Sequence, residues 1–154
     1  MNSKTFTRNQ SGAAAVEFAL VCIPLFVLIF GVIEFGLLMF NRHVLTNGCR
    51  EGARAGIVLR IPRLSDAEIS DRVNEFCDDH LITFTSTPDA LTPEVVRTDA
   101  DGVPLGTDES GNPILGGNGD LLTVKAAFQY DFAFLTILGL GPVTINGAAA
   151  MKME

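Results

Sequence analysis

The sequence of 154 residues predicts an α+β fold, in which a long N-terminal helix precedes a small antiparallel sheet with one packed helix. Three patterns predict this fold. Residues 13–40 are almost uncharged, a capped segment with helical periodicity covers about 66–79, and two segments near 122–132 and 143–153 alternate between apolar and polar residues. A period of 3.6 residues indicates a helix with one apolar face, whereas a period of two indicates a half-buried strand.

The apolar stretch at residues 13–40 contains only two charged residues, Glu17 and Glu34. As a helix it would be about 42 Å long, whereas the hydrocarbon core of a bilayer is about 30 Å thick. A secretory signal has an apolar core of about 7–15 residues with small residues after it. Here the small residues Gly12 to Ala15 come first. We therefore expect a membrane-spanning helix rather than a cleaved signal.

The charges on the two sides of this stretch differ. Lys4 and Arg8 precede it, residues 41–63 hold five arginines, and residues 64–154 hold four basic against fifteen acidic residues, a net charge of −11. Basic flanks tend to stay in the cytoplasm, so we expect a cytoplasmic N-terminus and a periplasmic C-terminal domain. The overall net charge of −7 argues against a nucleic-acid-binding protein.

The two glutamates of the apolar stretch need an explanation. A carboxylate inside the membrane costs about 2.5–3.5 kcal/mol on insertion scales. Glu17 either lies in the headgroup zone or has a function that requires the charge. Glu34 is expected near the far interface, where it either reaches toward water or pairs with an arginine of a neighbouring subunit.

The helix is expected to continue through residues 41–62 as a stalk, with Pro62 as its stop. Gly48, Gly52 and Gly56 recur every four residues and so share one face. Glycine costs about 1 kcal/mol inside a helix, and small residues at this spacing allow another element to approach closely. The stripe therefore predicts a docking face, for the protein's own sheet or for a partner helix; a frayed helix end is the alternative.

The C-terminal domain, residues 63–154, contains further local signals. Ser65 and Glu68 form a capping box for the helix at 66–79. A short strand is expected near 94–98, before a loop rich in glycine and proline. Residues 133–142 would join the two long strands. The apolar centre of this connecting segment is too short to span a bilayer. We expect it to form a hydrophobic cap, or an exposed patch for a partner or the membrane surface.

Cysteine and metal chemistry is sparse in the sequence. Cys49 and Cys77 would both face an oxidising periplasm, and a bridge between them would contribute about 3–4 kcal/mol. The sequence contains no Cys-x-x-Cys and no histidines at metal-ligand spacing. The segment Gly116 to Asp120 is one residue off a calcium-binding repeat and occurs once. We expect no bound metal and no cofactor.

The segment from Gly12 to Phe18, GAAAVEF, resembles the processing site of type IV pilin-like proteins. In that site a basic leader ends in glycine, and the fifth residue after the cut is glutamate followed by an aromatic residue. Together with GVIEFG at 31–36 and LTNGCREGARA at 45–55, it is similar to the TadE-like family, the pseudopilins of the bacterial tight-adherence (Tad) pilus. Phe18 stands where the major pilin of that system usually has tyrosine.

The resemblance implies a division into a leader at 1–12, a transmembrane helix at 13–40, the stalk at 41–62 and a periplasmic domain at 63–154. It implies that a prepilin peptidase cuts between Gly12 and Ala13, and that Glu17, next to Phe18, then meets the freed amine of another subunit and sets the register of assembly. The implied partners are a sister pseudopilin and other pilus assembly proteins at the bacterial inner membrane. Catalysis, a small-molecule substrate, a cofactor and nucleic acid are not implied.

Two other kinds of protein remain possible from the sequence. A signal-anchored periplasmic enzyme or binding domain would need titratable residues clustered in a pocket, and no motif for one occurs. A single-pass scaffold or receptor fragment unrelated to pili is the third interpretation.

Overall fold

The computed structural model describes residues 10–58, 61–84, 91–109 and 113–153. Their elements follow in the order α1 (Gln10–Ile57), α2 (Asp66–His80), β1 (Glu94–Thr98), β2 (Leu121–Tyr130), the short 3₁₀ helix η1 (Leu135–Leu138) and β3 (Val143–Lys152). The predicted α+β fold is confirmed, and the predicted helix and strands agree with the observed bounds to within three residues.

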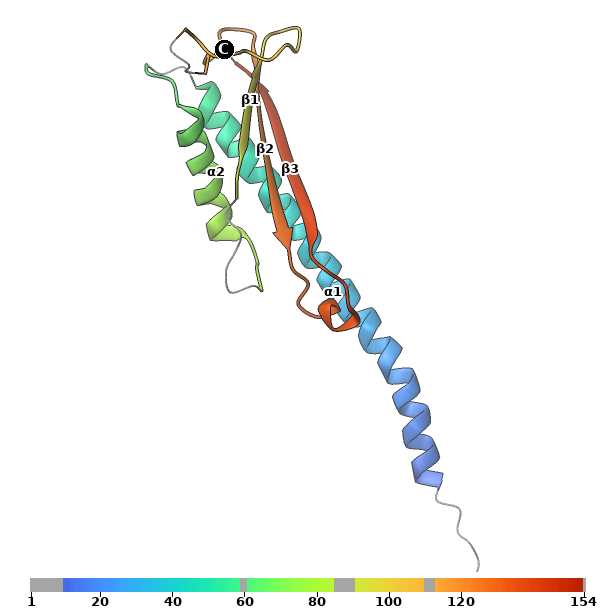
Figure 1. The fold of residues 1–154 in the computed structure, drawn as a ribbon. Coiled ribbons are helices and arrows are strands. Elements are labelled where there is room, and N and C mark those ends of the chain that lie inside the picture. Colours follow the sequence, from blue (N-terminus) through green and yellow to red (C-terminus); the bar gives the residue numbers. More distant parts are fainter. Residues whose placement is uncertain (1–9, 59–60, 85–90, 110–112, 154) are drawn as a thin grey trace, which may run out of the picture.

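Helix α1 is the axis of the molecule. It has 48 residues and is therefore about 72 Å long. It runs without interruption through the predicted membrane helix, with Pro24 inside it, and into the predicted stalk. It ends at Ile57, five residues before the expected stop at Pro62. Its C-terminal half packs against the sheet and α2, whereas its N-terminal half extends beyond them as a single helix (Figure 1).

The sheet has three antiparallel strands in the order β1-β2-β3. Along β2 every second residue is buried, and this face meets α1. The alternation that predicted a half-buried strand is confirmed here. The buried residues of β2 are Leu122, Val124, Ala126, Phe128 and Tyr130.

Helix α2 begins at a complete capping box, in which the Ser65 hydroxyl accepts from the Glu68 N–H and the Glu68 side chain accepts from the Ser65 N–H. Its apolar side lies on α1. At its first turn, Asp66 forms an ion pair with Arg97 of β1, whose side chain is 5% exposed. This pair joins the helical part of the domain to the edge of the sheet.

The core includes the segment that was expected to be a stalk. Leu45, Cys49 and Ala53 of α1 are fully buried against α2 and the sheet. Residues 41–57 are therefore the central helix of the C-terminal domain, and α1 enters that domain as one of its packed elements.

Candidate functional site

The N-terminal half of α1 is the largest exposed apolar surface of the described residues. Its most apolar 18-residue window has a mean hydropathy of 2.7 and contains no buried residue. By length and composition α1 is a candidate membrane span. The exposed side chains include Val16, Phe18, Leu20, Ile23, Leu28 and Val32.

The residues singled out for processing and register lie on this exposed half. Gly12, Ala13, Glu17 and Phe18 are all exposed, and no atom lies within 4 Å of the point where a Cβ on Gly12 would stand. Within the described residues Glu17 forms no hydrogen bond and no ion pair. The structure brings them together with no group among the described residues of the C-terminal domain, which leaves them exposed to another molecule.

Glu34 lies in a different environment, at the place where the tip of the β2–β3 hairpin meets α1. Its side chain is completely buried. Oε1 accepts hydrogen bonds from the Tyr130 hydroxyl and the Ala133 N–H, both at 2.8 Å, and Oε2 accepts from the Phe134 N–H at 2.9 Å. The carboxylate thus holds the end of β2 and the start of η1 against the helix.

The two predictions for Glu34 are wrong. The side chain neither reaches toward water nor pairs with an arginine of another subunit, because its acceptors are already used by its own chain. The same environment changes the pKa of Tyr130. Burial and then the neighbouring carboxylate raise the pKa of Tyr130 above its ordinary value, so its hydroxyl remains a donor at physiological pH.

A second buried polar residue, Asn41, lies two turns further along α1 and is fully buried. Its Nδ2 donates to the Ile82 carbonyl at 2.7 Å, and its Oδ1 accepts from the Ile82 N–H at 3.0 Å. One side-chain amide therefore satisfies both backbone polar groups of one residue. This pair attaches the segment after α2 to α1, and sequence reasoning missed it.

The glycine stripe of α1 faces α2. A Cβ on Gly48 would stand 2.7 Å from Cys77 Sγ, and a Cβ on Gly52 would stand 2.5 Å from Val73 Cγ2. A Cβ on Gly56 would stand 2.5 Å from Leu122 Cδ2 of β2. The expected occupants were the protein's own sheet or a partner helix. The structure places the protein's own α2 there instead, and the sheet reaches the stripe at Gly56 through Leu122.

Another close approach lies on the side of α1 that meets β3. A Cβ on Gly147 of β3 would stand 2.9 Å from the Leu45 carbonyl carbon and 3.0 Å from the Thr46 nitrogen. Because these are backbone atoms, a larger residue at 147 would push β3 away from α1. The glycines of both contacts let α2 and β3 pack closely on the same stretch of helix.

Cys49 and Cys77 both belong to the buried core of this interface. Both are free, fully buried cysteines in the structure. Burial raises the pKa of each thiol to about 11, with a further contribution at Cys77 from Cys49 and Asp78. The disulfide between them stays a prediction.

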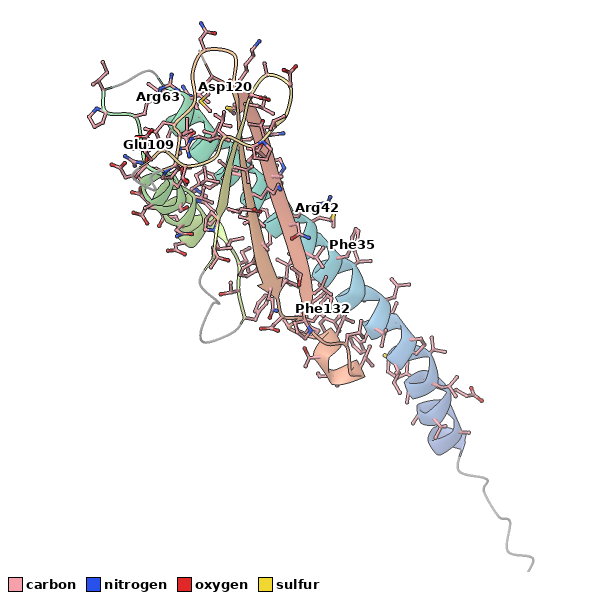
Figure 2. The ribbon with its side chains drawn as sticks, turned by 45° about the horizontal axis from the view of Figure 1, so that its top comes forward. Phe35, Arg42, Arg63, Glu109, Asp120 and Phe132 are labelled. Atoms are coloured by element: carbon pink, nitrogen blue, oxygen red, sulfur yellow. The ribbon has the colours of Figure 1, made fainter. Side chains whose placement is uncertain are left out.

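Charged groups gather at the end of the domain far from η1, where Arg63, Glu109 and Asp120 lie (Figure 2). In the loop that was compared with a calcium repeat, Asp120 Oδ2 accepts from the Gly117 N–H at 2.6 Å. Among the described residues no group of three or more His, Cys, Asp or Glu side chains could hold a metal ion.

Comparison with known proteins gives one match. The family model described as TadE-like protein matches residues 12–54, which are the exposed half of α1 and most of its packed half. This match confirms the resemblance that the sequence motifs indicated. No curated protein and no solved structure was found to match the chain.

Proposed function

Because residues 12–54 are TadE-like, we propose that this chain is a single-pass pseudopilin that acts in the assembly of a Tad pilus. Its N-terminus lies in the cytoplasm and its C-terminal domain in the periplasm. A prepilin peptidase removes residues 1–12, and the product works with a sister pseudopilin and other assembly proteins. The proposal includes no catalytic activity, cofactor, small-molecule substrate or nucleic acid.

One observation supports this proposal above the others. Glu17 is an exposed carboxylate on an otherwise apolar exposed helix half, and it has no hydrogen-bond or ion-pair partner within the part of the chain that the structure describes. Such a charge is costly in a membrane, and an amine freed at Ala13 of another subunit would neutralise it. A buried ion pair of this kind fixes the register between subunits more reliably than it adds stability.

The processing step is tested on the protein from cells that contain the peptidase. Mass spectrometry should find Ala13 as the N-terminal residue, and Gly12→Lys should leave the chain about twelve residues longer. If the wild-type chain from its native host retains residues 1–12, or if Gly12→Lys is still shortened, the proposed processing is wrong.

The role of Glu17 needs a separate test. Glu17→Ala should still be processed but should enter assemblies poorly, as measured by cross-linking to the sister subunit and by pilus yield. Leu20→Ala is the control, since Leu20 is an exposed residue of the same helix half and 72% accessible. Equal yields from the two variants would contradict the registry role.

A further inference from the structure

The exposed apolar surface of α1 continues onto the tip of the β2–β3 hairpin, residues 132–142. Ile137 is 87% exposed and Leu138 54% exposed, and Phe134 and Leu140 are also exposed. No charged residue occurs between Asp131 and Lys152. A patch of this kind on a small domain is typical of a binding surface or a membrane contact.

The position of the tip along α1 fixes its depth. The Phe134 ring stacks on Phe30 with a centroid distance of 4.6 Å. Next to this contact, an apolar groove of about 250 Å³ lies between η1 and α1. Ile23 and Phe26 line it on the α1 side, and Ile137 lines it on the η1 side. Figure 1 shows η1 beside the middle of α1, with several turns of helix continuing past it.

Those helix residues lie well inside the candidate span. About 20 helical residues cross the hydrocarbon core, so a span that starts at Ala13 reaches about Val32. Ile23 and Phe26 would then be near the middle of the bilayer and Phe30 would still be within it. Because η1 is in contact with this part of α1, the medium that surrounds α1 at this level also surrounds η1.

Much of the tip's backbone is hydrogen-bonded within the protein. In hydrocarbon, polar backbone groups must be satisfied within the protein. Glu34 accepts from the N–H groups of Ala133 and Phe134. Within the tip, the Ile137 N–H donates to the Phe134 carbonyl and the Gly139 N–H to the Thr136 carbonyl. Glu34 itself is shielded from lipid, because it is fully buried.

We propose that the hairpin tip, residues 132–142, is a second membrane-embedded element, which inserts beside α1 among the acyl chains of the leaflet on the domain's side. The occupant of the apolar face is lipid. The inference depends on α1 crossing the membrane, which is part of the proposed function. On this inference Glu34 has a role in the membrane, since its carboxylate accepts from the backbone N–H groups of the inserted tip.

The test uses the absence of tryptophan from this chain. Three full-length single-tryptophan variants are reconstituted at low protein density in phosphatidylethanolamine and phosphatidylglycerol vesicles that carry lipids brominated on the acyl chains. Ile137→Trp reports on the tip and Leu28→Trp on an exposed face of α1. Val103→Trp is the control for a position in water. Val103 is 58% exposed, and its carbonyl accepts from the N–H of Asp99, the residue that follows β1. Iodide, present on both sides of the bilayer, is the aqueous quencher.

The expected result is that brominated lipid quenches Ile137→Trp to the same degree as Leu28→Trp, while iodide quenches only Val103→Trp. If Leu28→Trp is quenched by lipid but Ile137→Trp behaves like Val103→Trp, the tip lies in water and the inference is wrong, while the span stands. If Ile137→Trp escapes both quenchers, it is covered by protein and lipid is not the occupant. If lipid fails to quench Leu28→Trp, the span itself fails and the inference with it.

Discussion

The Glu34 carboxylate accepts a 2.8 Å hydrogen bond from the hydroxyl of Tyr130, which lies 96 residues later in the chain. Both side chains are almost completely buried. Backbone N–H groups of Ala133 and Phe134 in the hairpin also donate to this carboxylate. The contact fixes the end of the sheet at one level of α1, so the exposed half of the helix and the C-terminal domain are held in one rigid relation.

We expect both Tyr130→Phe and Glu34→Gln to destabilise the protein. Tyr130→Phe removes one donor and should lower the free energy of unfolding by about 1.5–3 kcal/mol, as for hydrogen bonds to charged groups. Glu34→Gln should cost at least as much. The glutamine NH₂ group would stand opposite the Phe134 N–H, so two donors would face each other where the carboxylate now accepts. Thermal unfolding of the full chain in detergent, followed by circular dichroism, measures both.

The double variant separates a real contact from two independent losses. For groups in direct contact, the coupling energy should be about 0.5–3 kcal/mol. Tyr130→Phe combined with Leu20→Ala, which changes an exposed residue of the other half of α1, should show additive effects. Because glutamine keeps an oxygen that can accept from the Tyr130 hydroxyl, additive losses would mean that this bond does not depend on the charge of Glu34.

The sequence predicted those parts of the fold that depend on local patterns. The alternation along residues 122–130 predicted which face of β2 is buried, because successive side chains of a strand point to opposite faces. Ser65 and Glu68 predicted the start of α2, since a capping box involves only four residues. The candidate span, the TadE-like segment and the close approach at the glycine stripe were also predicted, because each depends on one continuous segment.

The polar contacts that Glu34 and Asn41 make with distant segments were not predicted. Glu34 was expected near water, because a single charge at the end of an apolar stretch usually lies at the interface, and its partners come almost a hundred residues later. One signal was present: Tyr130 is the only tyrosine of the chain and occupies the apolar face of its strand. A buried hydroxyl requires an acceptor, and the nearby sequence offered none on that face.

The glycine stripe gives a second prediction. Gly52→Ala would place a methyl group 2.5 Å from Val73 Cγ2, and overpacking of this kind costs about 1–3 kcal/mol. The gain in helix propensity, about 1 kcal/mol, does not offset the upper part of that range. We expect a lower thermal midpoint for Gly52→Ala than for the wild-type chain.

Gly36→Ala is the matched control in the same helix, since no atom lies within 4 Å of the point where its Cβ would stand. It should be neutral or stabilising. Val73→Ala combined with Gly52→Ala should recover part of the loss relative to the sum of the two single variants, because it removes the clashing methyl group. A neutral Gly52→Ala, or a pair whose losses simply add, would show that α2 does not pack on Gly52.

Asn41 gives a third prediction. Asn41→Leu keeps a similar volume but leaves the N–H and carbonyl of Ile82 without their partner. An unsatisfied buried polar group costs about 1–3 kcal/mol. We expect this local loss to appear as faster amide hydrogen exchange at Ile82, with little change at Val124 in the centre of β2. Unchanged exchange at Ile82 would mean that Asn41 does not hold this segment.

The buried thiols give a fourth prediction, on the reduced protein at alkaline pH. Their pKa values are about 11 in the folded chain, against 9.0 for the free thiol. Since burial raises the folded-state pKa, the resulting stabilisation is complete below pH 9 and is lost as the pH rises toward about 11, where the unfolded chain releases protons first. The free energy of unfolding should therefore fall across this interval.

Tyr130→Phe serves as the background for this titration, because the raised pKa of the phenol contributes in the same direction above pH 10. In that background, Cys49→Ala combined with Cys77→Ala should flatten the fall. Cys22→Ala, in the exposed half of α1, should leave it unchanged. A slope that survives the double cysteine variant would assign the alkaline loss to other groups. If the pair instead forms the predicted disulfide in the periplasm, the same slope should appear only after reductant is added, because a bridged cysteine has no thiol proton to lose.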